Sequence, residues 1–123
     1  MEPSSPEVVT LTGRIDPAEL RRFAERFEGM VKYVVDVDRR IVAIGGEMHA
    51  DAEQVLLEGG SRQADLWGAN YYPGRGPDGC IEFTSLINIR PSAGNRGMEL
   101  QDRALREKVR EITFALVGEG EPL

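Results

Sequence analysis

The sequence of 123 residues has little of three residue types, with one histidine, one cysteine and one tryptophan. It also has no apolar run near the roughly 18–20 residues that a membrane-spanning helix needs. Its start, MEPSSPEVVTLTG, lacks the basic segment and apolar block of a signal peptide. Because a lone cysteine, Cys80, cannot form an internal disulfide, the composition is typical of a reducing compartment. We therefore expect a cytoplasmic protein without a membrane span.

The sequence also lacks a long basic block, since its arginines are interleaved with acids and the net charge is −6. Proteins that bind nucleic acids or anionic membranes usually need a basic patch to neutralise phosphates, so both kinds of partner are disfavoured. What is present is 41% hydrophobic and 29% charged residues, which is too apolar for a disordered chain. The composition predicts a folded globular protein.

The length predicts a single domain. We place this α+β domain at residues 13–118, after a loose N-terminal arm at 1–12 and before a tail at 119–123. Within the arm, residues 8–11 can add a short edge strand because they are apolar or β-branched.

Two amphipathic helices have clear starts. Asp16 followed by Pro17 is typical of an N-cap and first helical position, and Gly29 ends this helix. Asp102 is the corresponding cap of a last helix that Gly118 closes. Between them, residues 51–58 predict a short helix.

The strands are expected in pairs. Two valine-rich runs flank Asp38-Arg39-Arg40 and predict a hairpin. A third strand at 64–72 contains Gly68, where a bulge or a close backbone approach is expected. The alternating segment 80–91 predicts the fourth. We therefore expect an α+β fold with a mostly antiparallel four-stranded sheet, helices on one face, and the order α-β-β-α-β-β-α.

The segment GGEMHAD places Glu47, His49 and Asp51 at alternate positions. If the strand continues through them, their side chains share one face and can surround a divalent metal ion, although no established metal motif is present. The favoured interpretation is that the segment joins a strand to a helix and that one acid caps the helix. The identity of any metal stays unknown.

Other motifs for covalent or cofactor chemistry are missing. Cys80 has no basic neighbours in sequence and is interpreted as a core thiol. Neither EGGSR nor SAGNRG is a P-loop, so we expect no cofactor, but Arg62 and Arg96 lie in these glycine-rich segments and can bind an anion. Arg90 can do the same at the end of its strand. The alternative is an internal salt-bridge network, in which Arg90 pairs with Glu82 or Asp65 and Arg96 pairs with Glu99.

The stretches IGGEMHADAEQVLLEGGSRQADLWGANYYP and IEFTSLINIRPSAGNRGMELQD resemble a small bacterial family of domains of unknown function. The resemblance covers most of residues 30–112. It implies neither an activity nor catalytic residues, because the family has none assigned. It marks only a dense set of polar signature residues.

Two functional hypotheses follow. The first is a polar pocket that binds a small anionic ligand, with acid/base catalysis as an option, in which case the protein is an enzyme. In this hypothesis the catalytic residues are Glu47 and His49, and the ligand-binding residues are Arg62, Asn70, Asn88, Arg90, Asn95 and Arg96. The second is a non-enzymatic interaction or regulatory module that forms a homodimer through the strand face of Trp67 and Tyr71.

Overall fold

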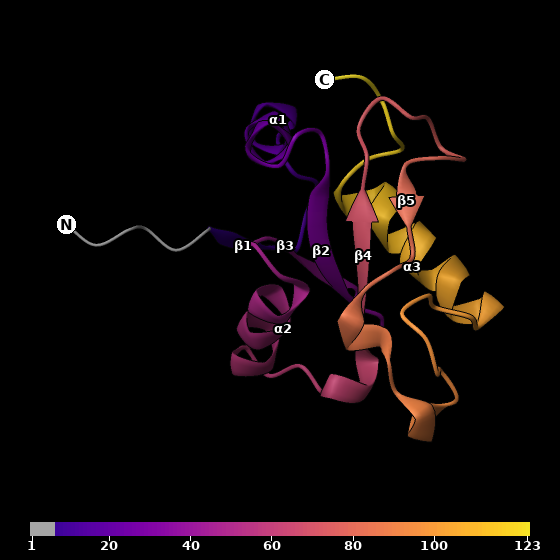
Figure 1. Ribbon diagram of the computed structural model, residues 1–123. Helices are drawn as coiled ribbons and strands as arrows, with labels where there is room; N and C mark the ends of the chain where they lie inside the picture. Colours follow the sequence, from indigo (N-terminus) through magenta and orange to yellow (C-terminus); the bar gives the residue numbers. More distant parts are fainter. Residues whose placement is uncertain (1–6) are drawn as a thin grey trace.

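Five strands form one antiparallel sheet in the computed structural model, which describes residues 7–123 (Figure 1). The spatial order is β1-β3-β2-β4-β5. The strands are β1 (Val8–Leu11), β2 (Val31–Asp36), β3 (Ile41–Gly45), β4 (Leu66–Tyr71) and β5 (Ile81–Glu82). The α+β class is confirmed, but the sheet has five strands rather than four, because β1 pairs with β3 along its whole length. Residues 8–11 thus belong to the sheet and not to a loose arm, while residues 1–6 of that arm lie outside the described residues.

Helices cover both faces of this sheet. The helices α1 (Pro17–Arg26) and α3 (Arg103–Leu116) pack on one face, and α2 (His49–Glu58) packs on the other (Figure 1). The expectation of helices on one face was therefore wrong. The reason is that β2 and β4 are apolar on both faces, so each face has to be covered. The order along the chain is β-α-β-β-α-β-β-α.

Each face has its own core. The larger core lies under α1 and α3 and includes Phe23, Tyr33 and Ile112, which are almost fully buried. Within it the hydroxyls of Tyr33 and Thr113 are 2.8 Å apart and share a hydrogen bond. The smaller core lies under α2 and consists of Val34, Ala43, Ala52, Leu56 and Leu66. The buried free thiol of Cys80 belongs to the larger core, as its sequence context predicted.

The predicted caps are present. The carboxylate of Asp16 accepts a hydrogen bond from the backbone N–H of Ala18 at 3.0 Å, and Asp102 accepts one from Leu105 at 2.9 Å. The carboxylate of Asp51 accepts from the N–H of Met48 at 3.0 Å, so an acid does cap the start of α2. These are local contacts between residues two or three positions apart, which explains why the sequence predicted them.

The segment 80–91 is not the long strand that its alternation predicted. Only Ile81–Glu82 forms a strand, and the chain then turns into a short 3-10 helix, Leu86–Asn88. The hydroxyl of Ser85 accepts from the N–H of Ile87 at 3.2 Å and caps this turn. The side chain of Asn88 also bonds the backbone of β4, which holds the segment against the sheet face instead of along its edge.

The strand face that was expected to form a dimer surface is interior. Trp67 is 4% exposed and Tyr71 is 1% exposed, and both pack in the core under α1 and α3. The hydroxyl of Tyr71 also accepts a hydrogen bond from the N–H of Gly120 at 2.8 Å, which fixes the C-terminal segment beside this strand. The homodimer surface proposed for these two residues is therefore not available.

Candidate functional site

A row of polar side chains crosses the sheet on the face that α2 partly covers. Lys32 on β2 is the antiparallel partner of Asn70 on β4, and Asn70 is the partner of Glu82 on β5. Paired residues of neighbouring strands project from the same face, so these three side chains lie next to one another. The apolar core under α2 stops short of this row. A cation, an amide and a carboxylate are therefore aligned at one end of the sheet.

His49 covers this end of the sheet as the first residue of α2. One of its ring nitrogens, Nε2, lies 2.9 Å from the carbonyl oxygen of Ala69. Since a carbonyl only accepts hydrogen bonds, Nε2 carries the proton, and Nδ1 of the neutral ring is left with a lone pair. The ring lies close over Gly68, where a β-carbon would be only 3.2 Å from Cδ2 of His49. The missing side chain at Gly68 is thus what lets the imidazole approach β4.

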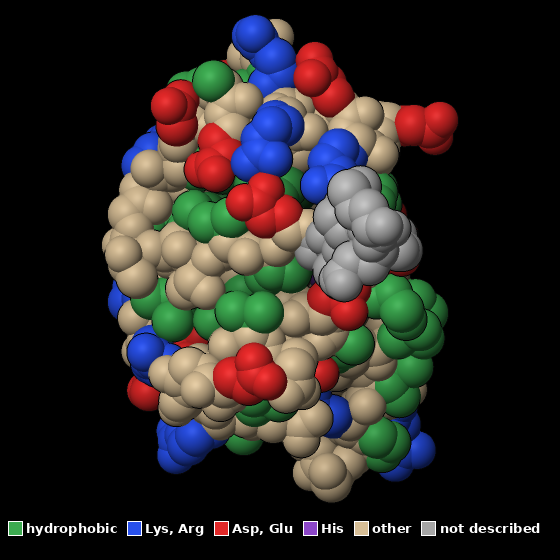
Figure 2. Space-filling model, turned by 90° about the vertical axis from the view of Figure 1, so that its left-hand side faces the viewer, with side chains coloured by type: hydrophobic (Ala, Val, Ile, Leu, Met, Phe, Trp, Pro, Cys, Tyr) green, Lys and Arg blue, Asp and Glu red, His purple; other side chains and the backbone are tan. Residues whose placement is uncertain are grey.

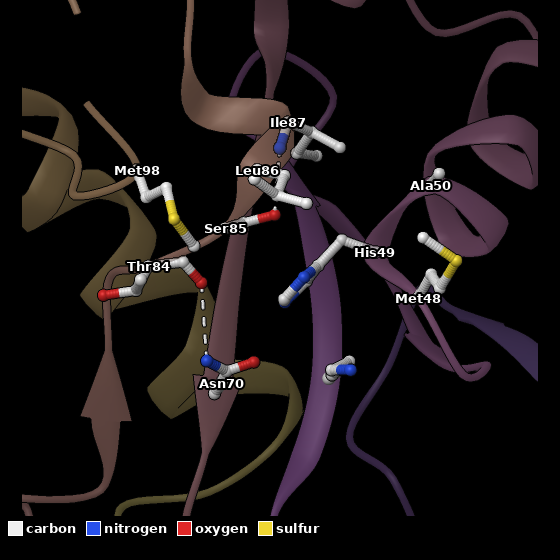
Figure 3. Close-up of a pocket in the computed structure, with 10 residues that line it drawn as sticks. Met48, His49, Ala50, Asn70, Thr84, Ser85, Leu86, Ile87 and Met98 are labelled. Carbon is white, nitrogen blue, oxygen red and sulfur yellow. Dashed lines mark hydrogen bonds between the residues drawn. The ribbon is translucent and has the colours of Figure 1, made fainter. Parts of the chain in front are cut away.

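A pocket of about 250 Å³ opens between the start of α2 and the segment 84–87 (Figure 3). Its polar lining comes from Lys32, His49, Asn70, Thr84 and Ser85. Its apolar lining comes from Met48, Ala50, Leu86, Ile87 and Met98. Figure 3 shows Met48 and Ala50 on the α2 side of His49 and Met98 on the opposite side. The pocket therefore has apolar walls and a polar end.

The side-chain amide of Asn70 has a fixed orientation. Its nitrogen donates to the carboxylate of Glu82 at 2.7 Å and toward the carbonyl of Thr84 at 3.4 Å. Both partners are acceptors, so the opposite orientation of the amide would place oxygen against oxygen. The amide oxygen, Oδ1, is turned away from Thr84 toward the side where His49 lies (Figure 3). This oxygen is shielded from solvent beside the His49 ring, and its interaction with the imidazole raises the pKa of His49.

Lys32 brings a positive charge to the pocket. Its ammonium donates to the carbonyl oxygen of Glu47 at 2.7 Å, which uses one of three N–H groups. Within the described part of the chain, no carboxylate forms a salt bridge with it. An ammonium that is half-buried among apolar side chains and has no counter-ion attracts anions more strongly than an exposed one.

His49 is held in its neutral form. Burial lowers the pKa of His49 below its ordinary value of 6.5, and the nearby charge of Lys32 lowers it further. The hydrogen bonds of the ring to the carbonyl of Ala69 and to the side chain of Asn70, and the negative charge of Glu82, raise the pKa and offset part of this effect. The ring is therefore an uncharged hydrogen-bonding group at neutral pH.

This lowered pKa predicts a loss of stability in mild acid. Below pH 6.5 the unfolded chain takes up a proton at His49 before the folded chain does, so the free energy of unfolding falls with decreasing pH until the folded pKa is reached. We measure the free energy of unfolding with urea at about pH 7.5 and at about pH 5. Between these values we expect this free energy to fall more for the unmodified protein than for His49→Gln, which lacks the titrating ring. Equal pH dependence of the two proteins would contradict the lowered pKa.

Two of the predicted site residues, His49 and Asn70, line this pocket together. The Glu47 side chain is exposed and does not line it, although its carbonyl oxygen positions Lys32. Asp51 is used as a cap. Among residues 7–123, no three His, Cys, Asp or Glu side chains are grouped as metal ligands would be.

Asn88 and Asn95 hold the chain in shape. The side chain of Asn88 accepts from the N–H of Gly68 at 2.9 Å and donates to the carbonyls of Gly68 and Met98 at 3.0 and 3.1 Å. Asn95 donates to the carbonyl of Asn88 at 2.8 Å and accepts from the N–H of Gln101 at 2.9 Å. Because these contacts use their polar atoms on backbone groups, both residues are scaffold for the pocket wall rather than part of its lining.

The three predicted anion-binding arginines lie outside this pocket. The guanidinium of Arg90 stacks over the ring of Trp67 at 3.8 Å from its centroid and donates to the carbonyl oxygens of Gln63 and Leu66. Arg62 is exposed and pairs with Asp65 at 3.0 Å, and Arg96 is exposed. Arg90 thus joins segments of the fold through backbone acceptors, which neither the anion-site nor the salt-bridge interpretation anticipated.

Lys32 and the apolar walls were not predicted as site residues. A signal for Lys32 was present in the sequence, because it is a charged residue within a strand of apolar neighbours and it lies on the face opposite to Val31 and Tyr33. Met48, Leu86 and Met98 gave no comparable signal, since single apolar residues are common on protein surfaces.

Comparisons with known proteins place the chain in a family. The chain belongs to DUF5674, proteins of unknown function, whose family model matches residues 9–116. This confirms the resemblance that the sequence motifs indicated. No curated protein and no solved structure matches the sequence. No helix in the described part of the chain is both long enough and apolar enough to cross a bilayer.

Proposed function

We propose that this member of DUF5674 binds a small anionic ligand in the pocket between α2 and the segment 84–87. The observation that carries the proposal is the ammonium of Lys32, which reaches the pocket without a carboxylate partner among the described residues. The protein as a whole carries a net charge of −6, and Lys32 is only partly exposed. It supplies two free N–H donors for a carboxylate or phosphate oxygen.

The apolar walls support the same proposal. They reduce the local access of water, and a charge pair is stronger where water is excluded. Met48, Leu86 and Met98 are 56%, 63% and 42% exposed, although they are large apolar side chains. On the face that holds α2, hydrophobic side chains gather in the lower half, whereas charged side chains are most frequent near the top (Figure 2). A ligand that covers these side chains removes apolar surface from water.

A more specific form of this proposal is that the pocket carries out acid/base catalysis, and His49 is the one residue on which it rests. With Nε2 bound to Ala69, Nδ1 is the atom that can accept a proton from a ligand. The lowered pKa keeps this atom unprotonated at neutral pH. Glu47 has no part in this version, because its carboxylate does not line the pocket.

The two lysines of the chain provide a matched test. Isothermal titration with acetate, longer carboxylates and inorganic phosphate, each against the corresponding uncharged alcohol or amide, measures whether charge drives binding. We expect Lys32→Gln to weaken binding of the best anion by about tenfold or more, as for the loss of a charge-assisted hydrogen bond. The control Lys108→Gln alters an exposed lysine on α3 and leaves the affinity unchanged. Absence of anion binding, or equal effects of the two substitutions, would refute the proposal.

A further inference from the structure

We propose that the outer edge of β1 pairs with the same edge of a second copy of this chain, in antiparallel orientation about a two-fold axis at Val9. The pairing joins the sheets of the two copies into one continuous sheet. This surface lies apart from the pocket, so the inference goes beyond the proposed function and does not depend on it. It is carried by the open hydrogen-bonding groups of β1 and by the two hydrophobic cores that end there.

The backbone of β1 has open groups on its outer side. β1 lies at one edge of the sheet and pairs on its inner side with β3 (Figure 1). The N–H of Gly46 donates to the carbonyl oxygen of Glu7 at 3.1 Å, so the backbone groups of residue 7 face β3. Because these groups alternate in direction along a strand, residues 9 and 11 also face β3, whereas those of Val8 and Thr10 point outward. Within residues 7–123, these outward N–H and C=O groups have no hydrogen-bond partner.

The opposite edge of the sheet is covered by the chain itself. β5 has only two residues, and the segment that follows it pairs with residues 98–100. The N–H of Leu100 donates to the carbonyl oxygen of Phe83 at 2.9 Å, and the N–H of Ser85 donates to that of Met98 at 3.0 Å. Short strands and covering segments prevent edge-to-edge pairing of sheets. No segment within residues 7–123 pairs with the outer side of β1, and its sequence, VVTL, has neither a charge nor a proline.

Both hydrophobic cores reach the edge at β1. Val9 packs against the core under α1 and α3, and Val8 packs against the core under α2. Both valines are only partly buried, and Thr10 is exposed. A strand that pairs with β1 covers part of both valines, so the burial of apolar surface adds to the hydrogen bonds.

A second copy satisfies this edge by symmetry. When two β1 strands run antiparallel with the two copies of Val9 opposite each other, Val8 of each copy faces Thr10 of the other. Each of these two pairs exchanges two N–H···O=C bonds, so all the outward groups of both strands are used. The paired residues are uncharged, and no like charges face each other across the ladder, although each copy carries a net charge of −6.

An extended peptide from another protein fits this edge less well. Such a peptide becomes the new edge strand and leaves its own outward groups open. The two-fold pair leaves only the two β5 edges, next to which each chain pairs with itself. Because the same surface is used on both copies, the association closes as a dimer and does not continue into a polymer.

The molar mass at different concentrations tests the pairing. By sedimentation equilibrium of the full chain from about 1 μM to about 1 mM, we expect a monomer that converts to a dimer. Thr10→Pro removes one outward N–H from each copy, and proline is tolerated at an edge position whose N–H faces solvent. We therefore expect this variant to weaken the dimer about tenfold or more while the monomer stays folded by circular dichroism. The matched control is Thr10→Val, which keeps the N–H and the branched shape and leaves the dimer in place.

Cysteine cross-linking tests the register, and it remains informative if Thr10→Pro does not fold. In the proposed pair, the Cα atoms of the two copies of residue 9 are about 4.5 Å apart, which a disulfide can span. The two copies of residue 10 are displaced by two positions along the strands, so their Cα atoms are more than about 7 Å apart. Under the same mild oxidation, we expect Val9→Cys to form a covalent dimer and Thr10→Cys to form little. The native thiol of Cys80 is buried and is common to both variants.

Three results would overturn the inference. The first is a chain that stays monomeric over the whole concentration range, in which case slow hydrogen exchange of the Val8 and Thr10 amides would show that the chain covers this edge itself. The second is a dimer that Thr10→Pro and Thr10→Val affect equally, which would place the interface elsewhere. The third is equal cross-linking of Val9→Cys and Thr10→Cys, which would exclude the two-fold axis at residue 9.

Discussion

Replacing Asn88 with aspartate is expected to lower the free energy of unfolding by about 3 kcal/mol or more. Asn88 is fully buried and its side chain pairs both backbone groups of Gly68. Asn88→Asp keeps the size of the side chain but replaces the donating nitrogen with an oxygen. That oxygen then faces the carbonyl oxygens of Gly68 and Met98, so two acceptors lose their donor and a negative charge is buried beside them.

Chemical denaturation of the two proteins at neutral pH measures this effect. Gln63→Glu makes the same exchange of amide for carboxyl at an exposed side chain, and we expect it to change stability by less than about 0.5 kcal/mol. The introduced carboxyl at position 88 would be easier to accommodate when protonated, so its destabilising effect should shrink as the pH falls. If Asn88→Asp lowered the free energy of unfolding by no more than the control does, the hydrogen bonds of Asn88 to Gly68 and Met98 would contribute little to stability.

The second large effect is expected for Gly68→Ala, which should lower the free energy of unfolding by about 2–3 kcal/mol and weaken ligand binding in the pocket. A β-carbon at this position would lie 2.6 Å from the β-carbon of Ser85, 2.7 Å from its hydroxyl oxygen and 3.2 Å from Cδ2 of His49. These distances are too short for non-bonded atoms, so the segment around Ser85 or the ring of His49 has to move.

A rescue variant tests whether this clash is the cause. In Gly68→Ala combined with Ser85→Gly, the nearest side-chain atoms are removed, and we expect part of the stability to return. Gly97→Ala is the matched control, because a β-carbon there meets no atom within 4 Å. Thermal and urea unfolding give the stabilities, and titration with an anion that binds gives the affinity. If Gly68→Ala and Gly97→Ala were equally stable, the close approach would not constrain the fold.

The site was only partly predictable from sequence, and the residues show why. His49 was noticed because it is the single histidine, and Asn70 because it lies on a predicted strand. Arg90 was expected to bind an anion, but its guanidinium meets backbone carbonyls of residues 24 and 27 positions away. Side-chain patterns carry no information on where distant carbonyl groups will lie. The same limit hid the partner of Asn88, whose amide binds the backbone of Gly68, 20 positions away.

The sequence by itself determined the features that depend on neighbours along the chain. The helix caps at Asp16, Asp51 and Asp102 and the hairpin between β2 and β3 involve residues only a few positions apart. The close approach at Gly68 was also indicated, because glycine in a strand leaves space for another part of the chain.

Tertiary structure decided which parts meet. It placed α2 on the face opposite to α1 and α3, because both faces of β2 and β4 are apolar and each had to be covered. It turned residues 86–88 of the alternating segment into a 3-10 helix against β4, because the amide of Asn88 pairs with the backbone of Gly68. It also brought Lys32, His49 and Asn70 together from three elements. Periodicity reports which face of a strand is apolar, but the partner of each face is selected by packing and hydrogen bonding over the whole chain.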